Sequence, residues 1–156
     1  MKLHILDAET YFDREYSLRR LDPASYILDS RFELIGIAVK EPGSVAYWVE
    51  GPDAPAFFAG LDPNDIMTAS HNALFDNCIW SYRYGFVPRV MVDTLGVSRA
   101  VLSLESNSLE SVAEHLGLGA KGQEIQQAIG MHLADLKTNS DFYRAYVDYA
   151  LNDATL

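Results

Sequence analysis

Leu3-His4-Ile5-Leu6-Asp7-Ala8-Glu9-Thr10 is the first apolar stretch of the chain, and its apolar residues occupy both odd and even positions. Because successive side chains of a strand point to opposite faces, this pattern predicts a β-strand that is covered on both faces and lies centrally in a sheet. Asp7 and Glu9 are two residues apart, so they project from the same face of that strand. Two carboxylates buried together require a cation to balance their charge.

Two β-rich segments follow at residues 31–40 and 45–49, and Glu41-Pro42-Gly43-Ser44 joins them. Proline at the second turn position and glycine at the third are typical of a type II turn, so these segments predict a hairpin. Beyond it the pattern predicts helices at 54–61, 73–84, 108–116 and from about 140 to the end, with strands at 66–70 and 91–95. A hairpin followed by alternating helices and strands predicts an α/β fold, a mixed sheet with helices on both faces.

The helices carry further signals. Asn72, Ser108 and Ser140 are expected as N-caps, since their side-chain oxygens can accept hydrogen bonds from free backbone N–H groups. Apolar stripes are expected at helical spacing: Leu74, Phe75, Cys78, Ile79 and Tyr82 on one helix, and Phe142, Tyr146, Tyr149 and Ala150 on the last. Residues 13–30 are expected to be irregular, and residues 117–130 to be a short helix or a mobile loop.

Composition narrows the class of protein. The 156 residues, 49% of them hydrophobic, suffice for one compact domain over residues 1–156. Cys78 is the only cysteine, which excludes an internal disulfide and a cysteine zinc site and predicts a reducing, cytoplasmic location. No apolar stretch approaches the roughly 20 residues of a membrane span, so no membrane association is expected.

Charge is unevenly distributed. With 12 Lys and Arg against 22 Asp and Glu, the formal charge is −10, which argues against general adhesion to nucleic-acid phosphates unless cations cancel it locally. The irregular segment nevertheless gathers positive charge, at Arg14, Arg19 and Arg20, with Arg31 just after it. It also contains Asp13-Arg14-Glu15, a second Asp-x-Glu, which is interpreted as solvated surface charge. About one such pattern is expected by chance among 13 Asp and 9 Glu.

Two more carboxylates occupy informative places. Asp76 follows a strand-to-helix junction, which is typical of an acid in the first turn of a helix but also allows it to meet Asp7 across the sheet. Tyr149 and Asp153 are one helical turn apart, so both lie on the inner face of the last helix, where an acid needs a partner. His4 is out of phase with Asp7 and is expected to be a buried core histidine.

Taken together, Asp7-x-Glu9, Asn72-x-x-Phe75-Asp76 and Tyr149-x-x-x-Asp153 resemble the three exonuclease motifs of the DEDD superfamily, proofreading 3′-5′ exonucleases of ribonuclease H-like fold. Tyr149, where other members carry histidine, resembles the DEDDy branch. Several segments further resemble the exonuclease domain of phage-type family A DNA polymerases: Asp7-x-Glu9-Thr10-Tyr11-Phe12 and residues 31–36, 71–76, 93–95 and 114–119.

This resemblance implies that Asp7, Glu9, Asp76 and Asp153 bind two divalent metal ions, Mg²⁺ or Mn²⁺, and that Tyr149 orients the attacking water. All-oxygen ligands suit these hard cations, and ions about 3.5–4 Å apart can stabilise both the attacking and the leaving oxygen. The implied substrate is a single-stranded or frayed 3′ end of DNA, and the implied products are nucleoside 5′-monophosphates, as in proofreading during DNA replication.

The resemblance also implies substrate contacts at Thr10, Tyr11, Phe12, Asn72 and Phe75. Aromatic residues at such positions can stack on a base. For Thr10, Tyr11 and Phe12, completion of the core at the end of a strand is an equally good interpretation, and for Asn72 the N-cap is the safer one.

Sequence leaves several alternatives open. An exoribonuclease of the same branch fits, because the catalytic motifs do not distinguish the sugar. A catalytically silent nucleic-acid-binding domain is disfavoured, because it has no need for four costly carboxylates. The chain stops three residues past Asp153, inside a helix that family members usually continue. It therefore corresponds either to a domain excised from a polymerase or to a standalone homologue, and a polymerase domain or subunit is an implied partner. Asp93 is expected to have a structural role.

Overall fold

The computed structural model describes residues 1–119 and 124–156, except for the side chains of 124 and 125. Its centre is a five-stranded sheet in the order β3-β2-β1-β4-β5. The strands are β1 (Lys2–Thr10), β2 (Leu34–Lys40), β3 (Tyr47–Glu50), β4 (Ile66–Ser70) and β5 (Val90–Asp93). β2 is antiparallel to β1 and β3, whereas β4 is parallel to β1 and β5. The predicted mixed sheet with a central first strand is therefore confirmed.

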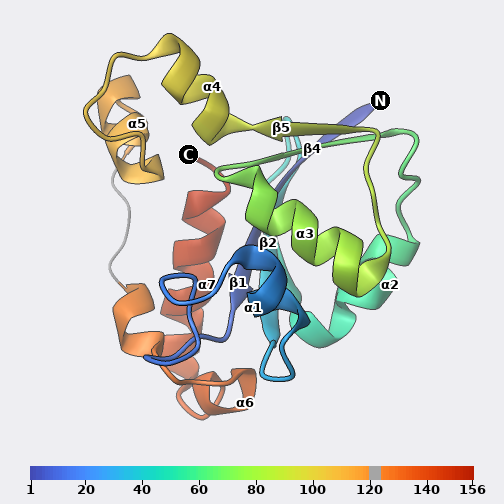
Figure 1. Cartoon of the computed structure of the whole chain (residues 1–156), viewed down its shortest axis with the longest axis vertical. Coiled ribbons are helices and arrows are strands. Elements are labelled where there is room, and N and C mark those ends of the chain that lie inside the picture. The colour runs from blue at the N-terminus through green and yellow to red at the C-terminus, as the bar shows by residue number, and fades with distance from the viewer. Residues whose placement is uncertain (120–123) are drawn as a thin grey trace.

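Helices cover both faces of this sheet, as predicted. They are α1 (Pro23–Leu28), α2 (Ala54–Ala59), α3 (Ala73–Tyr84), α4 (Thr94–Val101), α5 (Leu109–Leu116), α6 (Leu133–Leu136) and α7 (Ser140–Asp153), with 3₁₀ turns η1 (Gly51–Asp53) and η2 (Glu124–Ala128). Figure 1 shows α7 on one side of the sheet and α2 and α3 on the other, while α4 and α5 extend beyond the end of β5. Among the helices of the described residues, none is both long and apolar enough to cross a membrane.

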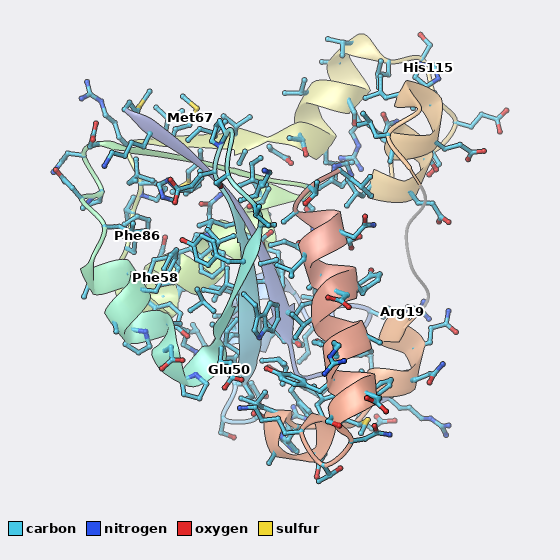
Figure 2. All side chains as sticks on the ribbon, turned by 180° about the vertical axis from the view of Figure 1, so that it is seen from behind. Arg19, Glu50, Phe58, Met67, Phe86 and His115 are labelled. Atoms are coloured by element: carbon cyan, nitrogen blue, oxygen red, sulfur yellow. The ribbon has the colours of Figure 1, made fainter. Side chains whose placement is uncertain are left out.

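Each face of the sheet has its own core. On the α2 and α3 side aromatic rings cluster among aliphatic side chains, and Phe58 packs its ring against Trp80 and Phe86 with centroids 5.0 Å apart in each pair. Figure 2 shows Phe58 and Phe86 on the side of the sheet away from α7. On the α7 side small residues meet, since Ala38 of β2 packs against Ala150 of α7. This small-residue contact lets the helix lie close to the strands.

Two helix predictions need correction. The last helix begins at Ser140 as expected, but its cap is Asn139, whose side chain accepts a hydrogen bond from the Phe142 backbone N–H. The predicted stripe of α3 is wrong at Leu74 and Tyr82, which are 66% and 52% exposed. Polar residues turn inward instead. Asn77 is buried, and hydrogen bonds offset the cost of burying its polar groups. Its side-chain amide donates to the Ala73 carbonyl oxygen, and its amide oxygen accepts from the Thr68 hydroxyl.

Two predicted segments also differ. The expected irregular stretch contains α1, which begins after Asp22, an N-cap that accepts a hydrogen bond from the Ser25 N–H. The expected strand at 91–95 ends at Asp93, because Thr94 starts α4. Within 117–130, Gly117 ends α5 with a left-handed φ of 68° and η2 forms later, while residues 120–123 lie outside the described part of the chain. His4 is 4% exposed, which confirms the expected buried histidine.

Candidate active site

The candidate site lies where β1 and β4 separate at their carboxyl ends. Backbone pairing between these strands covers residues 2–5 and 66–69 only. Beyond it, side chains from the β4–α3 junction continue the contact, since the Ser70 hydroxyl donates to the Leu6 carbonyl oxygen over 2.6 Å and the Ala8 N–H donates to Asp76 Oδ1 over 3.0 Å. The divergence of parallel strands is a common location for sites in open α/β sheets, and here it brings Asp76 to the segment that holds Asp7.

Asp76 is buried in an environment that disfavours its charge. Only 4% of the residue is exposed. Burial raises the pKa of its carboxyl well above the ordinary value of 3.8, the negative charge of Asp7 raises this pKa further, and the hydrogen bond from the Ala8 N–H opposes both effects. Clustered buried carboxylates of this kind favour binding of a cation.

α7 contributes the third group of side chains. Tyr149 and Asp153 are 6% and 8% exposed, so both lie on the inner face as predicted. The pKa of Tyr149 is raised, first by burial, then by the charge of Asp153 and their hydrogen bond, and then by the charges of Glu9 and Asp7. Acidic residues from β1 and from α7 therefore act on the same phenol.

Tyr146, expected only as a core residue, also reaches this site. It is 1% exposed, and its hydroxyl donates to Glu9 Oε2 over 3.3 Å. Burial and the charge of Glu9 both raise its pKa, so the phenol keeps its proton. The spacing of Tyr146 and Tyr149, three residues apart on one helix face, was the signal in the sequence that could have identified it.

The carboxylates do not form a ready-made metal cage. In the part of the chain that the structure describes, no three His, Cys, Asp or Glu side chains are grouped closely enough to hold a metal ion. Hydrogen bonds from the Ala8 N–H to Asp76 and from Tyr146 to Glu9 nevertheless join α3 and α7 to the carboxyl-terminal half of β1. The role of the four carboxylates as ligands is therefore a proposal, developed below.

A cleft of about 910 Å³ begins next to these residues. Thr10 and Phe75, sequence neighbours of Glu9 and Asp76, line it together with Phe12. The remaining lining residues are Asp13, Arg14, Ser17, Leu18, Arg19, Arg20, Tyr26, Gln126 and Ile129. Three of the predicted substrate residues thus share one cleft with three arginines.

The arginine-bearing loop, residues 13–20, is held in place by its own first residue. Asp13 Oδ1 accepts hydrogen bonds from the N–H groups of Glu15 and Tyr16 over 2.7 and 2.6 Å, and Asp13 Oδ2 accepts one from the Tyr11 hydroxyl over 2.9 Å. These hydrogen bonds lower the pKa of Asp13 below its ordinary value. Asp13 is partly exposed, so it is surface charge as interpreted, and its carboxylate in addition fixes the backbone of the loop. Tyr16 anchors the same loop, since it is fully buried and donates to the Tyr26 carbonyl oxygen.

The four arginines of this region are not equivalent. Arg31 does not line the cleft, and it binds Asp29 through two nitrogens over 2.9 and 2.8 Å. Arg20 pairs with Glu15 over 3.2 Å, with both side chains largely exposed. No ion pair with a carboxylate joins Arg14 or Arg19 within the described residues. Arg14 and Arg19 are therefore the cations most available to an anionic ligand in the cleft.

The other two predicted substrate residues lie elsewhere. Tyr11 does not line the cleft, because its ring stacks on His132 with centroids 4.0 Å apart. Asn72 lines a separate cleft of about 560 Å³ that also contains Arg99. Asn72 occupies the N-cap position of α3 with a left-handed φ of 72°, but its side chain makes no capping hydrogen bond, so the predicted capping role of that side chain is wrong.

Asp93 performs the capping instead. Its Oδ1 accepts hydrogen bonds from the N–H groups of Asn72, Ala73 and Leu95 over 3.1, 3.2 and 3.1 Å. One carboxylate thus fixes the start of α3, which carries Asp76, and the start of α4. The expected structural role of Asp93 is confirmed.

No protein-family model matches the sequence, and no curated protein matches it. Solved structures do. NrnC from Brucella melitensis with bound Mg²⁺ is 16% identical, with a TM-score of 0.64 over 97% of this chain and 65% of that one. RNase D from Trypanosoma brucei in complex with RNA U12 is 13% identical, with a TM-score of 0.68 over 98% of this chain and 52% of that one.

A third match is the family B DNA polymerase of the archaeon Pyrobaculum calidifontis, which is 18% identical with a TM-score of 0.67 over 99% of this chain and 23% of that one. NrnC has also been solved bound to pGG. These likenesses confirm a ribonuclease H-like α/β fold. The chain spans less than two thirds of the length of each of these three proteins.

Proposed function

We propose that this chain is a metal-dependent 3′-5′ exonuclease of the DEDD type. The observation that carries the proposal is the burial of carboxylates on β1, α3 and α7, where the Ala8 N–H of β1 binds Asp76 and Tyr146 of α7 binds Glu9, next to a cleft lined by arginines and aromatic rings. The fold shared with NrnC and RNase D supports the same class of activity. The roles of individual residues follow from the sequence motifs, since β1, α3 and α7 each carry one of the three motifs.

The donor set fits divalent cations. Asp7, Glu9, Asp76 and Asp153 offer only oxygen ligands, which suit Mg²⁺ or Mn²⁺. Burial, and after it the like charge of Asp7, raises the pKa of Asp76, and a cation would balance this charge. When bound, two such ions would lower the pKa of a water, neutralise the charge of the phosphate and stabilise the departing 3′ oxygen. NrnC, of the same fold, has been solved with bound Mg²⁺.

The side chains of this chain perform the remaining work. The four carboxylates hold the cations, and the neutral phenol of Tyr149 orients the attacking water through a hydrogen bond at its hydroxyl oxygen. Burial and the nearby acids raise the pKa of Tyr149, so it retains its proton at neutral pH and positions the water without acting as its base. The water oxygen would form a bond to phosphorus as the bond between phosphorus and the 3′ oxygen breaks. The water would lose a proton to solvent and the 3′ oxygen would gain one as a hydroxyl, which releases a nucleoside 5′-monophosphate.

The cleft supplies the substrate contacts. Phe12 and Phe75 can stack on the terminal base, a contact worth about 1–3 kcal/mol, and Thr10 can contact the sugar. Arg14 and Arg19 bind backbone phosphates, so attraction of the strand is local in a protein whose formal charge is −10. Asn72 contributes from the neighbouring cleft, and Tyr11 acts by holding Asp13 and the arginine-bearing loop.

We assign DNA as the substrate, with proofreading as the biological role and a polymerase domain or subunit as the partner. The resemblance to phage-type family A polymerases and to the DEDDy branch supports this assignment, and so does the fold shared with the Pyrobaculum polymerase. A second candidate is an exoribonuclease. It is favoured by the likeness to RNase D in complex with RNA and to NrnC bound to pGG.

The test uses 5′-labelled single-stranded DNA and RNA of the same sequence, each with Mg²⁺, Mn²⁺ or chelator, resolved on a denaturing gel. We expect a metal-dependent ladder that shortens from the 3′ end and is faster on DNA. Asp153→Asn should abolish it, whereas Asp148→Asn, an exposed acid on the same helix, should not. A faster ladder on RNA would support the exoribonuclease. Binding of both strands without digestion would reject the nuclease in favour of a silent binding domain.

A further inference from the structure

Tyr146 and Glu9 form a contact that the exonuclease motifs do not include. The Tyr146 hydroxyl donates to Glu9 Oε2 over 3.3 Å, and both residues are buried, with 1% and 8% of their surfaces exposed. Tyr146 lies on α7 and Glu9 on β1, so the hydrogen bond joins two of the three segments that supply the proposed metal ligands.

The packing around Tyr146 fixes where its hydroxyl points. The indole ring of Trp48 meets the Tyr146 ring edge to face, with centroids 6.4 Å apart. Trp48 itself lies over Gly36, where an added Cβ would come within 2.1 Å of the indole. Gly36 is the β2 residue paired with Glu9. Glycine at position 36 therefore leaves room for the Trp48 indole, which packs edge to face against Tyr146 next to Glu9.

The chemistry of the two groups fixes the direction of the hydrogen bond. A phenol has one O–H to donate and an ionised carboxylate can only accept, so the Tyr146 hydroxyl donates to Glu9 Oε2. A hydrogen bond donated to the ionised form of a carboxylate favours that form, which is the form that binds a cation.

We propose that Tyr146 is a positioning residue that orients the Glu9 carboxylate toward a divalent metal ion. The inference rests on the proposed function for the presence of the metal site, but it concerns a different group from Tyr149, whose hydroxyl faces Asp153. α7 thus carries two phenols one turn apart, of which Tyr146 serves the ligand on β1 and Tyr149 serves the reaction.

The test compares Tyr146→Phe with Tyr143→Phe. The first variant removes only the hydroxyl that faces Glu9 and keeps the ring against Trp48. The second removes a hydroxyl of the same helix that binds Glu50 and Trp48, over 2.9 and 3.1 Å, outside the proposed metal site. Mn²⁺ binding to the full chain is measured by calorimetry, and digestion of labelled DNA is measured over a range of Mn²⁺ concentrations.

For Tyr146→Phe we expect the Mn²⁺ dissociation constant to rise about 10-fold, as is common when a partner of a metal ligand is removed. The kcat at saturating Mn²⁺ should stay within about threefold of the unmodified chain. Tyr143→Phe should leave Mn²⁺ affinity unchanged. A Tyr146→Phe variant with unchanged Mn²⁺ affinity would overturn the inference, whatever its melting temperature.

A double-variant cycle with Glu9→Gln separates positioning from a general effect on folding. If Tyr146 acts through Glu9, Tyr146→Phe should have no further effect on Mn²⁺ affinity in the Glu9→Gln background. An equal loss in both backgrounds would overturn the inference. The metal titration does not depend on digestion, so the two proposals fail separately: Mn²⁺ binding without digestion rejects the exonuclease alone, and unchanged affinity in Tyr146→Phe rejects the positioning role alone.

Discussion

The chain contains two Asp-x-Glu sequences six residues apart, and the structure uses them in different ways. Asp7 and Glu9 lie on the central strand, where Glu9 is 8% exposed and contacts Tyr146. Asp13 and Glu15 lie in the loop that follows, where Asp13 binds backbone N–H groups and Glu15 pairs with an exposed arginine. The chemistry of an Asp-x-Glu pair thus depends on its burial and on the backbone groups around it.

The electrostatic consequences of the two pairs are opposite. Next to the strand pair, burial and then the charge of Asp7 raise the pKa of Asp76, so ionisation of Asp76 costs stability. In the loop pair, hydrogen bonds from Tyr16, Tyr11 and Glu15 lower the pKa of Asp13. Carboxylates that are close together and uncompensated favour cation binding. The Asp13 carboxylate is already compensated by hydrogen bonds, so it stabilises one conformation of its loop. This difference supports the proposal that the strand pair binds metal and that the loop pair shapes the cleft.

The largest expected effect separates the two pairs directly. Asp7→Asn should lower the rate of metal-dependent digestion by on the order of 10³-fold or more, because a proposed metal ligand is lost. Glu15→Gln removes the matching charge of the loop, but its exposed pair with Arg20 contributes little, so the rate should change less than about twofold. Single-turnover digestion of labelled DNA measures both. Similar losses in the two variants would contradict the comparison.

The next effect concerns the cleft wall. Replacing both Arg14 and Arg19 with alanine should raise the KM for DNA about 10-fold, and it should reduce the slope of the salt dependence of binding by about one unit for each arginine that binds a phosphate. Arg31→Ala should leave KM and the salt dependence unchanged, since Arg31 is bound to Asp29. Fluorescence polarisation at several salt concentrations measures the salt dependence, and steady-state digestion measures KM. An effect of Arg31→Ala equal to that of the double variant would remove the distinction between the arginines.

Much of the fold was predictable because its signals are local. The apolar run of β1 and the Pro-Gly turn identify the central strand and the hairpin, and the bounds of α3 match the prediction at both ends, Ala73 and Tyr84. Helix α4 was not predicted, because the segment that begins it was interpreted as the end of a strand and Asp93 caps α3 and α4 together, a role that depends on tertiary contact. The start of α1 was predictable, since Asp22-Pro23 is a typical N-cap followed by proline.

The site was predictable to a different extent. Periodicity and motif spacing indicated the acids of β1, α3 and α7, because each position is defined within its own segment. Partners far apart in the sequence could not be inferred in this way: Tyr11 stacks on His132, and Tyr146 reaches Glu9 across the sheet. The burial of Asn77 on α3 was also hidden, because a polar residue on a buried face runs against the apolar periodicity that locates a helix.

A smaller effect concerns stability and pH. Burial and the charge of Asp7 raise the pKa of Asp76 above its ordinary value of 3.8. At pH values between 3.8 and the raised pKa, the folded protein binds more protons than the unfolded chain, so the free energy of unfolding falls as pH rises. Asp76→Asn removes the charge of Asp76 itself and keeps an oxygen for the Ala8 N–H. In chelator at about pH 7.5 the variant should melt about 2–4 °C higher for each kcal/mol of repulsion relieved, with the difference shrinking toward about pH 4. Melting curves in chelator across this pH range measure it. A lower melting temperature at the upper end of the range would instead make Asp76 a stabilising helix-terminus acid.

The smallest effect tests the loop pair itself. Asp13→Ala removes the acceptor for three hydrogen bonds, so the arginine-bearing loop should become less ordered and the KM for DNA should rise about threefold while kcat stays unchanged. Because the folded-state pKa of Asp13 is lowered, its stabilising contribution is present above pH 3.8 and is lost as pH falls through that lowered pKa. Steady-state kinetics and hydrogen exchange of residues 13–20 measure the two consequences. Asp13→Asn is the matched control, since it retains an oxygen acceptor and should preserve most of the loop. A fall in kcat comparable to that of Asp7→Asn would place the loop pair in the catalytic site and remove the distinction between the two sequences.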